Sequence, residues 1–165
     1  MNKIHINILT SLRIILGWLF LYFTIVQFNI YYLIFIFILT AISDNLDGIL
    51  ARRFKLTTDN GAKFDVICDF IFIMLSTLAG VLINLIPFWF LFVIILKLIE
   101  FFKTSKGDFL TYDKFGHLVS LMFYAFPIVA ILINSKTIVL ILTLFITICA
   151  IISSILRIGD KNDFA

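Results

Sequence analysis

Six long apolar runs, separated by short polar segments, constrain this chain more than any other feature. They cover approximately residues 4–28, 31–51, 62–83, 86–102, 115–133 and 137–158. Each run is close to or above the length of about 20 residues that a helix needs to cross a bilayer. A strand surrounded by lipid would leave backbone groups unpaired, and the runs do not alternate in polarity as the strands of a membrane barrel do. We therefore predict an all-α integral membrane protein with six transmembrane helices.

The composition excludes the main classes of soluble protein. Of the 165 residues, 62% are hydrophobic and 14% are charged, whereas a soluble domain carries about 25% charged residues. The two cysteines, Cys68 and Cys149, both lie in apolar runs and do not form the pattern of a disulfide scaffold. Six spans leave no room for a separate soluble domain, so we expect one membrane domain over residues 1–165 and no nucleic-acid partner.

The placement of Lys and Arg predicts the orientation in the membrane. If the N-terminus is cytoplasmic, ten of the 13 Lys and Arg residues fall on the cytoplasmic side, one (Lys136) falls on the opposite side, and Arg13 and Lys97 lie within runs. Positive charge is enriched in cytoplasmic loops, so we expect both termini in the cytoplasm. The bias towards Ile, Phe, Asn and Lys is typical of an AT-rich genome, and we expect a bacterial plasma membrane.

Four aspartates lie at the ends of two neighbouring runs, where a charge is costly to insert into a membrane. Asp44 and Asp47 are three residues apart, and Asp65 and Asp69 are four apart, so each pair shares a helix face. A short loop joins the two helices, and their acidic faces can point at each other. Protons or divalent cations would relieve the repulsion, and carboxylate oxygens favour Mg²⁺ or Mn²⁺ over Zn²⁺. The pattern is typical of a two-cation site for phosphoryl chemistry.

The segment between the two acidic pairs suits a ligand that carries phosphate. Gly48 and Ala51 keep one helix face slim, which lets a large ligand approach the backbone. Arg52 lies one turn beyond Gly48 and is a natural partner for phosphate. Gly61 ends a turn and permits a tight start of the next helix.

These residues together resemble the signature of the CDP-alcohol phosphatidyltransferase family. That signature reads D-x2-D-G-x2-A-R-x8-G-x3-D-x3-D, and all eight fixed positions and every gap agree over the 26 residues 44–69. Six spans with cytoplasmic termini also fit the family. A shorter segment at the start of the first run, Asn7-x-Leu9-Thr10-x-x-Arg13, resembles another stretch that is common in these enzymes.

The resemblance implies a reaction and a role for each signature residue. A phosphatidyl group would pass from CDP-diacylglycerol to an alcohol with release of CMP, in an enzyme that is usually a homodimer and holds the lipid tails in the bilayer. Asp69 would be the general base on the acceptor hydroxyl. Two Mg²⁺ or Mn²⁺ ions would be held by Asp44, Asp47, Asp65 and Asp69. The CDP portion would be contacted by Asp47, Gly48, Ala51, Arg52, Thr58 and Gly61.

The acceptor alcohol has to be inferred from weaker signals. Residues 65–70 lack the Pro and Lys of phosphatidylglycerophosphate synthases, and the Phe-Gly-x-x-Pro segment of bacterial phosphatidylserine synthases is absent too. Members that use inositol phosphate gather basic residues around the acceptor phosphate, and Lys97, Lys114 and Arg157 could form such a cluster. We expect a phosphorylated acceptor, with glycerol 3-phosphate as the first choice and inositol phosphate or serine as alternatives.

Several of these basic residues also have simpler interpretations. Lys97 could instead pair with Glu100 one turn away, Arg157 could anchor a helix end at the interface, and Arg13 could either extend to the interface or reach the acidic site. A divalent-cation transporter would also use an acidic pocket. It would have no need of Arg52, and it would be expected to place its acids near the middle of the bilayer.

Overall fold

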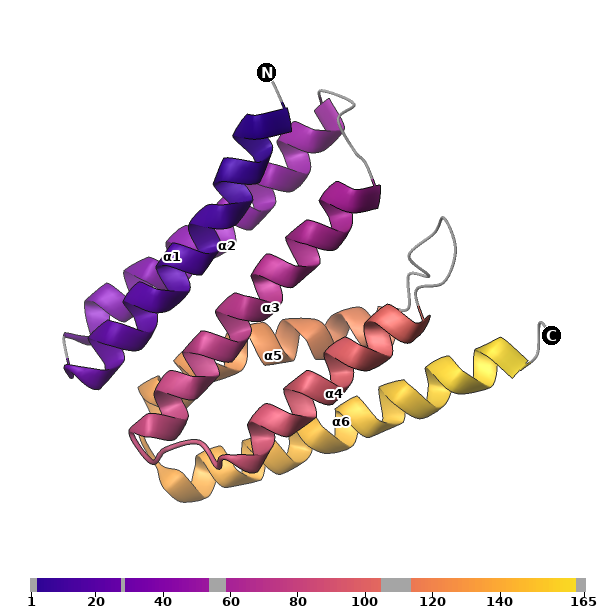
Figure 1. Ribbon diagram of the computed structural model, residues 1–165. Coiled ribbons are helices and arrows are strands. Elements are labelled where there is room, and N and C mark those ends of the chain that lie inside the picture. The colour runs from indigo at the N-terminus through magenta and orange to yellow at the C-terminus, as the bar shows by residue number, and fades with distance from the viewer. Residues whose placement is uncertain (1–2, 28, 54–58, 105–113, 163–165) are drawn as a thin grey trace. The chain divides into compact units, whose positions relative to one another are not determined.

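The computed structural model is all-helical over the residues that it describes, which are 3–27, 29–53, 59–104 and 114–162. Side chains are described for residues 11–27, 29–44, 63–103 and 115–157. The predicted all-α class is confirmed for this part of the chain (Figure 1). The helices are α1 (Lys3–Ile25), α2 (Ile30–Arg53), α3 (Asp59–Leu82), α4 (Trp89–Thr104), α5 (Lys114–Ile133) and α6 (Lys136–Asn162).

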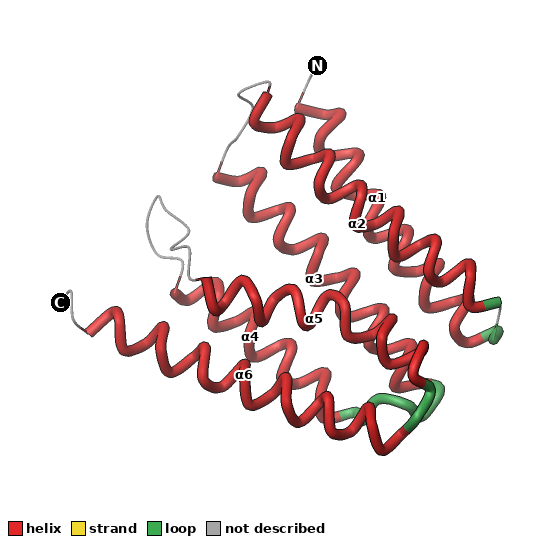
Figure 2. Tube along the Cα trace, turned by 180° about the vertical axis from the view of Figure 1, so that it is seen from behind, coloured by secondary structure: helices red, strands yellow, loops and turns green. Residues whose placement is uncertain are grey.

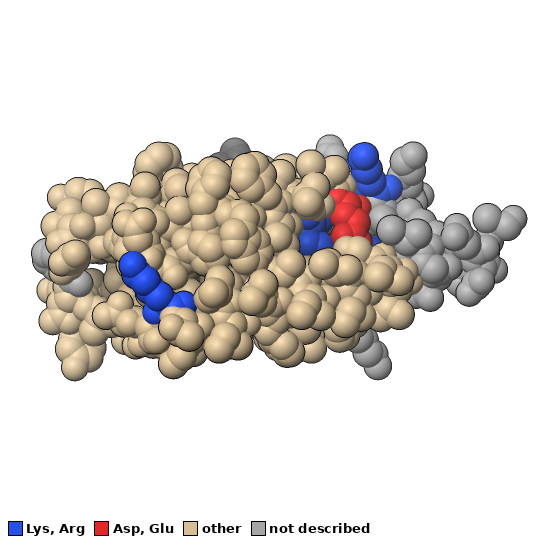
Figure 3. All heavy atoms as spheres, turned by 90° about the horizontal axis from the view of Figure 1, so that it is seen from below, with Lys and Arg blue, Asp and Glu red and all other residues tan. Residues whose placement is uncertain are grey.

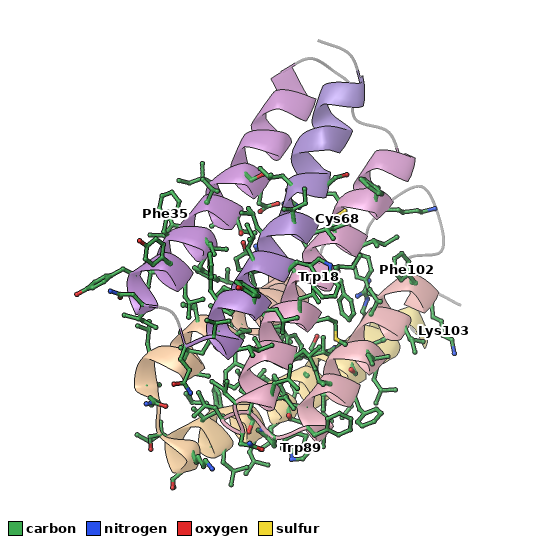
Figure 4. All side chains as sticks on the ribbon, turned by 60° about the vertical axis from the view of Figure 1, so that its left-hand side comes forward. Trp18, Phe35, Cys68, Trp89, Phe102 and Lys103 are labelled. Carbon is green, nitrogen blue, oxygen red and sulfur yellow. The ribbon has the colours of Figure 1, made fainter. Side chains whose placement is uncertain are left out.

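Within the part of the chain that the structure describes, three helices contain segments that are long and apolar enough to cross a membrane: Lys63–Leu82, Phe115–Ile133 and Lys136–Arg157. Shorter apolar segments lie at Ser11–Ile25 and Ile30–Asp44. Large apolar side chains are exposed on all six helices, and Trp18 of α1 and Phe35 of α2, labelled in Figure 4, are 59% and 63% exposed. On the face drawn in Figure 3, uncharged residues form almost all of the surface that the described residues contribute. Such a surface is suited to lipid rather than water.

The chain divides into two compact units, Met1–Ile83 and Asn84–Ala165. In the first unit, α1 contacts both α2 and α3 (Figures 1 and 2). The rings of Phe20 and Phe72 pack edge to face with their centroids 6.2 Å apart. A Cβ atom on Gly17 would lie 3.5 Å from the Cα of Phe72 and 3.0 Å from Cδ1 of Leu75. The missing side chain at Gly17 therefore lets α1 approach the backbone of α3.

In the second unit, α6 contacts both α4 and α5. The buried ring of Phe90 in α4 lies 5.7 Å from the ring of Phe123 and 5.0 Å from that of Phe126, both in α5. Pro127 continues this buried stretch within α5. Aromatic packing therefore links α4 to α5, while α6 contacts both.

The helix ends differ from the predicted runs by a few residues, and local backbone geometry explains where. The first helix ends at Ile25 because Gln27 adopts a φ of 53°, in the left-handed region that no helix continues through. Asn84 has a φ of 56°, and α4 begins at Trp89 after Pro87, whose carbonyl accepts a hydrogen bond from the N–H of Phe90 at 3.1 Å. The connection from α1 to α2 and the connection from α3 to α4 are therefore short.

Candidate active site

Three aspartates from two helices converge in the first unit. Asp44 of α2 and Asp65 and Asp69 of α3 each offer a carboxylate oxygen, and these three oxygens all lie within 4.8 Å of one another. The side chains are 46%, 40% and 31% exposed, respectively. The shared face of Asp65 and Asp69 follows from their spacing of one helical turn. The group is therefore accessible from solvent and has the size of a single cation site.

Arg13 of α1 bridges all three carboxylates. Its Nη1 atom donates to Oδ1 of Asp65 at 2.6 Å and to Oδ1 of Asp69 at 2.5 Å. Its Nη2 atom lies 3.0 Å from Oδ1 of Asp44. The side chain of Arg13 is fully buried, and these contacts place its guanidinium at the acidic group. This is one of the two alternatives that the sequence alone leaves open.

The packing of α1 against α3 explains how Arg13 reaches the acids. Arg13 and Gly17 are four residues apart and share one face of α1, and Asp65, Asp69 and Phe72 follow one face of α3 in the same way. Gly17 contacts α3 at Phe72. The close approach at this point brings the preceding turn of α1, which carries Arg13, against the turns of α3 that carry the aspartates. Gly17, which has no side chain, therefore allows Arg13 to reach the aspartates.

The donor set fits a divalent metal ion. Carboxylate oxygens are the ligands that Mg²⁺ and Mn²⁺ prefer. The guanidinium of Arg13 already contacts an oxygen of each carboxylate, so the group attracts and holds positive charge. Among the described residues, the three carboxylates outnumber the one guanidinium that bridges them. The side chain of Asp47, the fourth predicted ligand, lies outside the described residues.

The predicted contacts to CDP lie in a region that the structure describes only in part. The backbones of Gly48, Ala51 and Arg52 belong to α2 and that of Gly61 to α3, but the structure describes no side-chain surroundings for these positions. Thr58 lies outside the described residues altogether. The assignment of these residues to CDP binding therefore stays a prediction.

The predicted acceptor residues lie in the second unit. Nζ of Lys97 in α4 is 3.1 Å from Oε2 of Glu100 and donates to Oγ of Ser154 in α6 at 3.0 Å. The hydroxyl of Ser154 donates to the same Glu100 oxygen at 2.6 Å. The guanidinium carbon of Arg157 lies 5.3 Å from the centre of the Phe101 ring. The anticipated pair of Lys97 and Glu100 is present, and its contacts with Ser154 connect α4 to α6.

One feature of this arrangement, the contact of Ser154 with Lys97 and Glu100, was not predicted. The role of Ser154 was missed because a serine in an apolar run also commonly bonds to its own helix backbone, and no spacing rule links it to α4. The third predicted acceptor residue, Lys114, is the first residue of α5, and its side chain lies outside the described residues.

Comparison with known proteins supports one assignment. A search of curated proteins found no match to this chain. The family model described as CDP-alcohol phosphatidyltransferase matches residues 4–151. This match covers the acidic group, Arg13 and most of both units. The chain therefore belongs to the CDP-alcohol phosphatidyltransferase family, which comprises transferases for substituted phosphate groups.

Proposed function

We propose that this integral membrane protein transfers a phosphatidyl group from CDP-diacylglycerol to a small alcohol and releases CMP. Membership of the family supports transfer from a CDP-linked donor to an alcohol. The observation that carries the proposal is the convergence of Asp44, Asp65 and Asp69 on one point. The same membership argues against a divalent-cation transporter, because these family members are transferases.

The proposal assigns the metal ligands and the base to the signature aspartates. The family generally uses divalent metals, and two Mg²⁺ or Mn²⁺ ions held by Asp44, Asp47, Asp65 and Asp69 would neutralise the diphosphate of the donor and the leaving CMP. Asp69 accepts the proton of the acceptor hydroxyl at a carboxylate oxygen. The hydroxyl oxygen forms a bond to the lipid-side phosphorus, and the bond from that phosphorus to CMP breaks.

The choice of Asp69 as the base has support in its surroundings as well as in the signature. It is the least exposed of the three described aspartates, at 31%, and a base that is partly shielded from water competes less with solvent for the substrate proton. The donor nucleotide is assigned to the residues around the α2–α3 connection: Asp47, Gly48, Ala51, Arg52, Thr58 and Gly61.

For the acceptor we propose glycerol 3-phosphate, with inositol phosphate or serine as alternatives. The basic residues Lys97, Lys114 and Arg157 would bind the acceptor phosphate. Because Lys97 is paired with Glu100 and Ser154, an acceptor phosphate would compete with the Glu100 carboxylate for the ammonium group. This competition would make Lys97 a weaker phosphate ligand than a lysine without such a partner.

The proposed topology has six transmembrane helices, both termini in the cytoplasm and the site open to the cytoplasm, in a bacterial plasma membrane. One arrangement in the first unit supports it. The N-terminal ends of α1 and α3 and the C-terminal end of α2 lie together (Figure 1), as expected if the basic loop after α2 shares a side with the N-terminus. We further propose that residues 1–165 act as one membrane domain and that the enzyme is a homodimer.

A panel of acceptors tests the reaction and identifies the alcohol. Purified protein in detergent micelles is mixed with CDP-diacylglycerol and Mg²⁺, and glycerol 3-phosphate, inositol phosphate and serine are added one at a time. We expect CMP release with one acceptor above the rate without acceptor, and most strongly with glycerol 3-phosphate. If no acceptor increases CMP release from folded protein, the proposed reaction is wrong.

A further inference from the structure

We propose that Arg13 sets the metal affinity of the active site by competing with divalent cations for the same carboxylate oxygens. This inference rests on the proposed function, because it takes Asp44, Asp65 and Asp69 to be metal ligands. In the structure, the guanidinium holds the three carboxylates together. When a cation binds, Arg13 gives up its contacts with Asp65 and Asp69.

Arg13 contacts the same carboxylate oxygens that a metal ion would use. A single nitrogen, Nη1 of Arg13, lies 2.6 Å from Oδ1 of Asp65 and 2.5 Å from Oδ1 of Asp69. A Mg²⁺ ion bound to these two oxygens would lie about 2.1 Å from each. The cation and the guanidinium would then bind the same two oxygens, and their positive charges would repel each other at short distance. Both cannot bind these oxygens at full strength.

Arg13 and the three aspartates differ in their exposure to solvent. The Arg13 side chain is fully enclosed, whereas the three aspartates are between 31% and 46% exposed. A cation from solvent reaches the carboxylates on their open side, while the guanidinium contacts them from the protein interior. The two positive groups therefore approach one set of oxygens from different directions, and access does not require Arg13 to leave first.

The charges of the three carboxylates and of Arg13 determine how the site responds to a cation. Among the described residues, three carboxylates face one guanidinium, so the acidic groups outnumber the basic group and can attract a divalent cation. Without Arg13, all three would repel one another in a partly buried position, and α2 and α3 would lose the group that bridges them. Arg13 thus stabilises the metal-free protein and, for the same reason, opposes the binding of the metal.

Titration with Mn²⁺ tests the inference without any use of activity. Free Mn²⁺ is measured by electron paramagnetic resonance in detergent solutions of the wild type, Arg13→Gln, Arg13→Lys and Lys103→Gln. We expect Arg13→Gln to bind Mn²⁺ about tenfold more tightly than the wild type, a ratio within the range of one lost charge-assisted hydrogen bond. Lys103 is exposed at the end of α4 (Figure 4) and belongs to no assigned site, so Lys103→Gln controls for the loss of a positive charge and should match the wild type.

Arg13→Lys keeps the test decisive if the glutamine variant does not fold. Lysine retains the charge, but its single ammonium cannot contact the three carboxylates through two nitrogens, so Mn²⁺ affinity should fall between those of the wild type and Arg13→Gln. Mn²⁺ should also raise the Tm of either variant more than that of the wild type, because tighter binding stabilises the folded state more. If the folded variants bind Mn²⁺ no more tightly than the wild type, the inference is wrong.

The outcomes separate this inference from the proposed function. If the wild type releases CMP with Mg²⁺ while the Arg13 variants bind Mn²⁺ equally or more weakly, only the competing role of Arg13 fails. If the wild type neither binds Mn²⁺ nor releases CMP, both proposals fail.

Discussion

Enlarging Gly17 should separate α1 from α3 and thereby disturb the active site one turn away. In Gly17→Ala, the new Cβ lies 3.0 Å from Cδ1 of Leu75, the mobile end of a side chain that can move by a few tenths of an ångström. Alanine also favours the helix by about 0.8–1.0 kcal/mol relative to glycine. These two effects oppose each other, so the free energy of unfolding should change by less than about 1 kcal/mol.

Gly17→Leu should behave differently because its further atoms extend towards backbone. The Cβ position is 3.5 Å from the Cα of Phe72, and a helix backbone cannot move aside alone. Overpacking of this kind costs about 1–3 kcal/mol, and each kcal/mol lowers the Tm by roughly 2–4 °C in a chain of this length. The shifted α1 would also displace the turns of α3 that carry Asp65 and Asp69, so CMP release should fall together with the Tm.

Thermal unfolding followed by circular dichroism, together with the CMP release assay, measures both effects. Leu19→Phe is a suitable control because it enlarges a side chain on the exposed side of α1, where Leu19 is 40% exposed. This control should retain the Tm and the activity of the wild type. Wild-type values in Gly17→Leu, or an equal loss in Leu19→Phe, would refute the role given to the α1–α3 contact.

Two further predictions concern the chemistry of the site. Asp69→Asn should lower CMP release by about 10²–10⁴-fold, because an amide cannot accept the acceptor proton; circular dichroism should show an unchanged helix content, and turnover at the wild-type rate would remove Asp69 from the role of base. EDTA should stop CMP release, and added Mg²⁺ or Mn²⁺ should restore it to the initial rate. Activity that persists after chelation and dialysis would contradict the assignment of metal ions to the aspartates.

The helices could be predicted from the sequence because a membrane imposes so strong a rule. Backbone groups in lipid must be paired within the segment, so an apolar run of sufficient length already implies a helix. The choice of packing partners could not be predicted in the same way. Phe35 is 63% exposed and Phe72 is fully buried, yet both are phenylalanines in apolar runs. When lipid-facing and buried positions are equally apolar, hydrophobic periodicity does not distinguish them.

The acidic group could be predicted to a greater extent than the residue that bridges it. The spacing of Asp65 and Asp69 determines that they share a face, and the short connection to α2 brings Asp44 near. The position of Arg13 depends instead on how α1 is rotated about its axis, which is determined by the contact at Gly17. A lone arginine in an apolar run is compatible with either rotation, because its long side chain can reach the interface or the interior.

In the first unit, the same contacts support both the proposed chemistry and the stability of the fold. Carboxylates that are suited to bind cations would, by themselves, repel each other strongly in a partly buried position, where the effective dielectric constant is below that of water. Arg13 connects α1 to both acid-bearing helices, so the same contacts that assemble the three helices also bring the candidate metal ligands together. Because a cation would bind the folded unit through these oxygens and an unfolded chain has no such site, metal binding would add directly to the free energy of unfolding. Substitutions at the aspartates should therefore be interpreted with stability and turnover measured side by side, since a loss of either can follow from one broken contact.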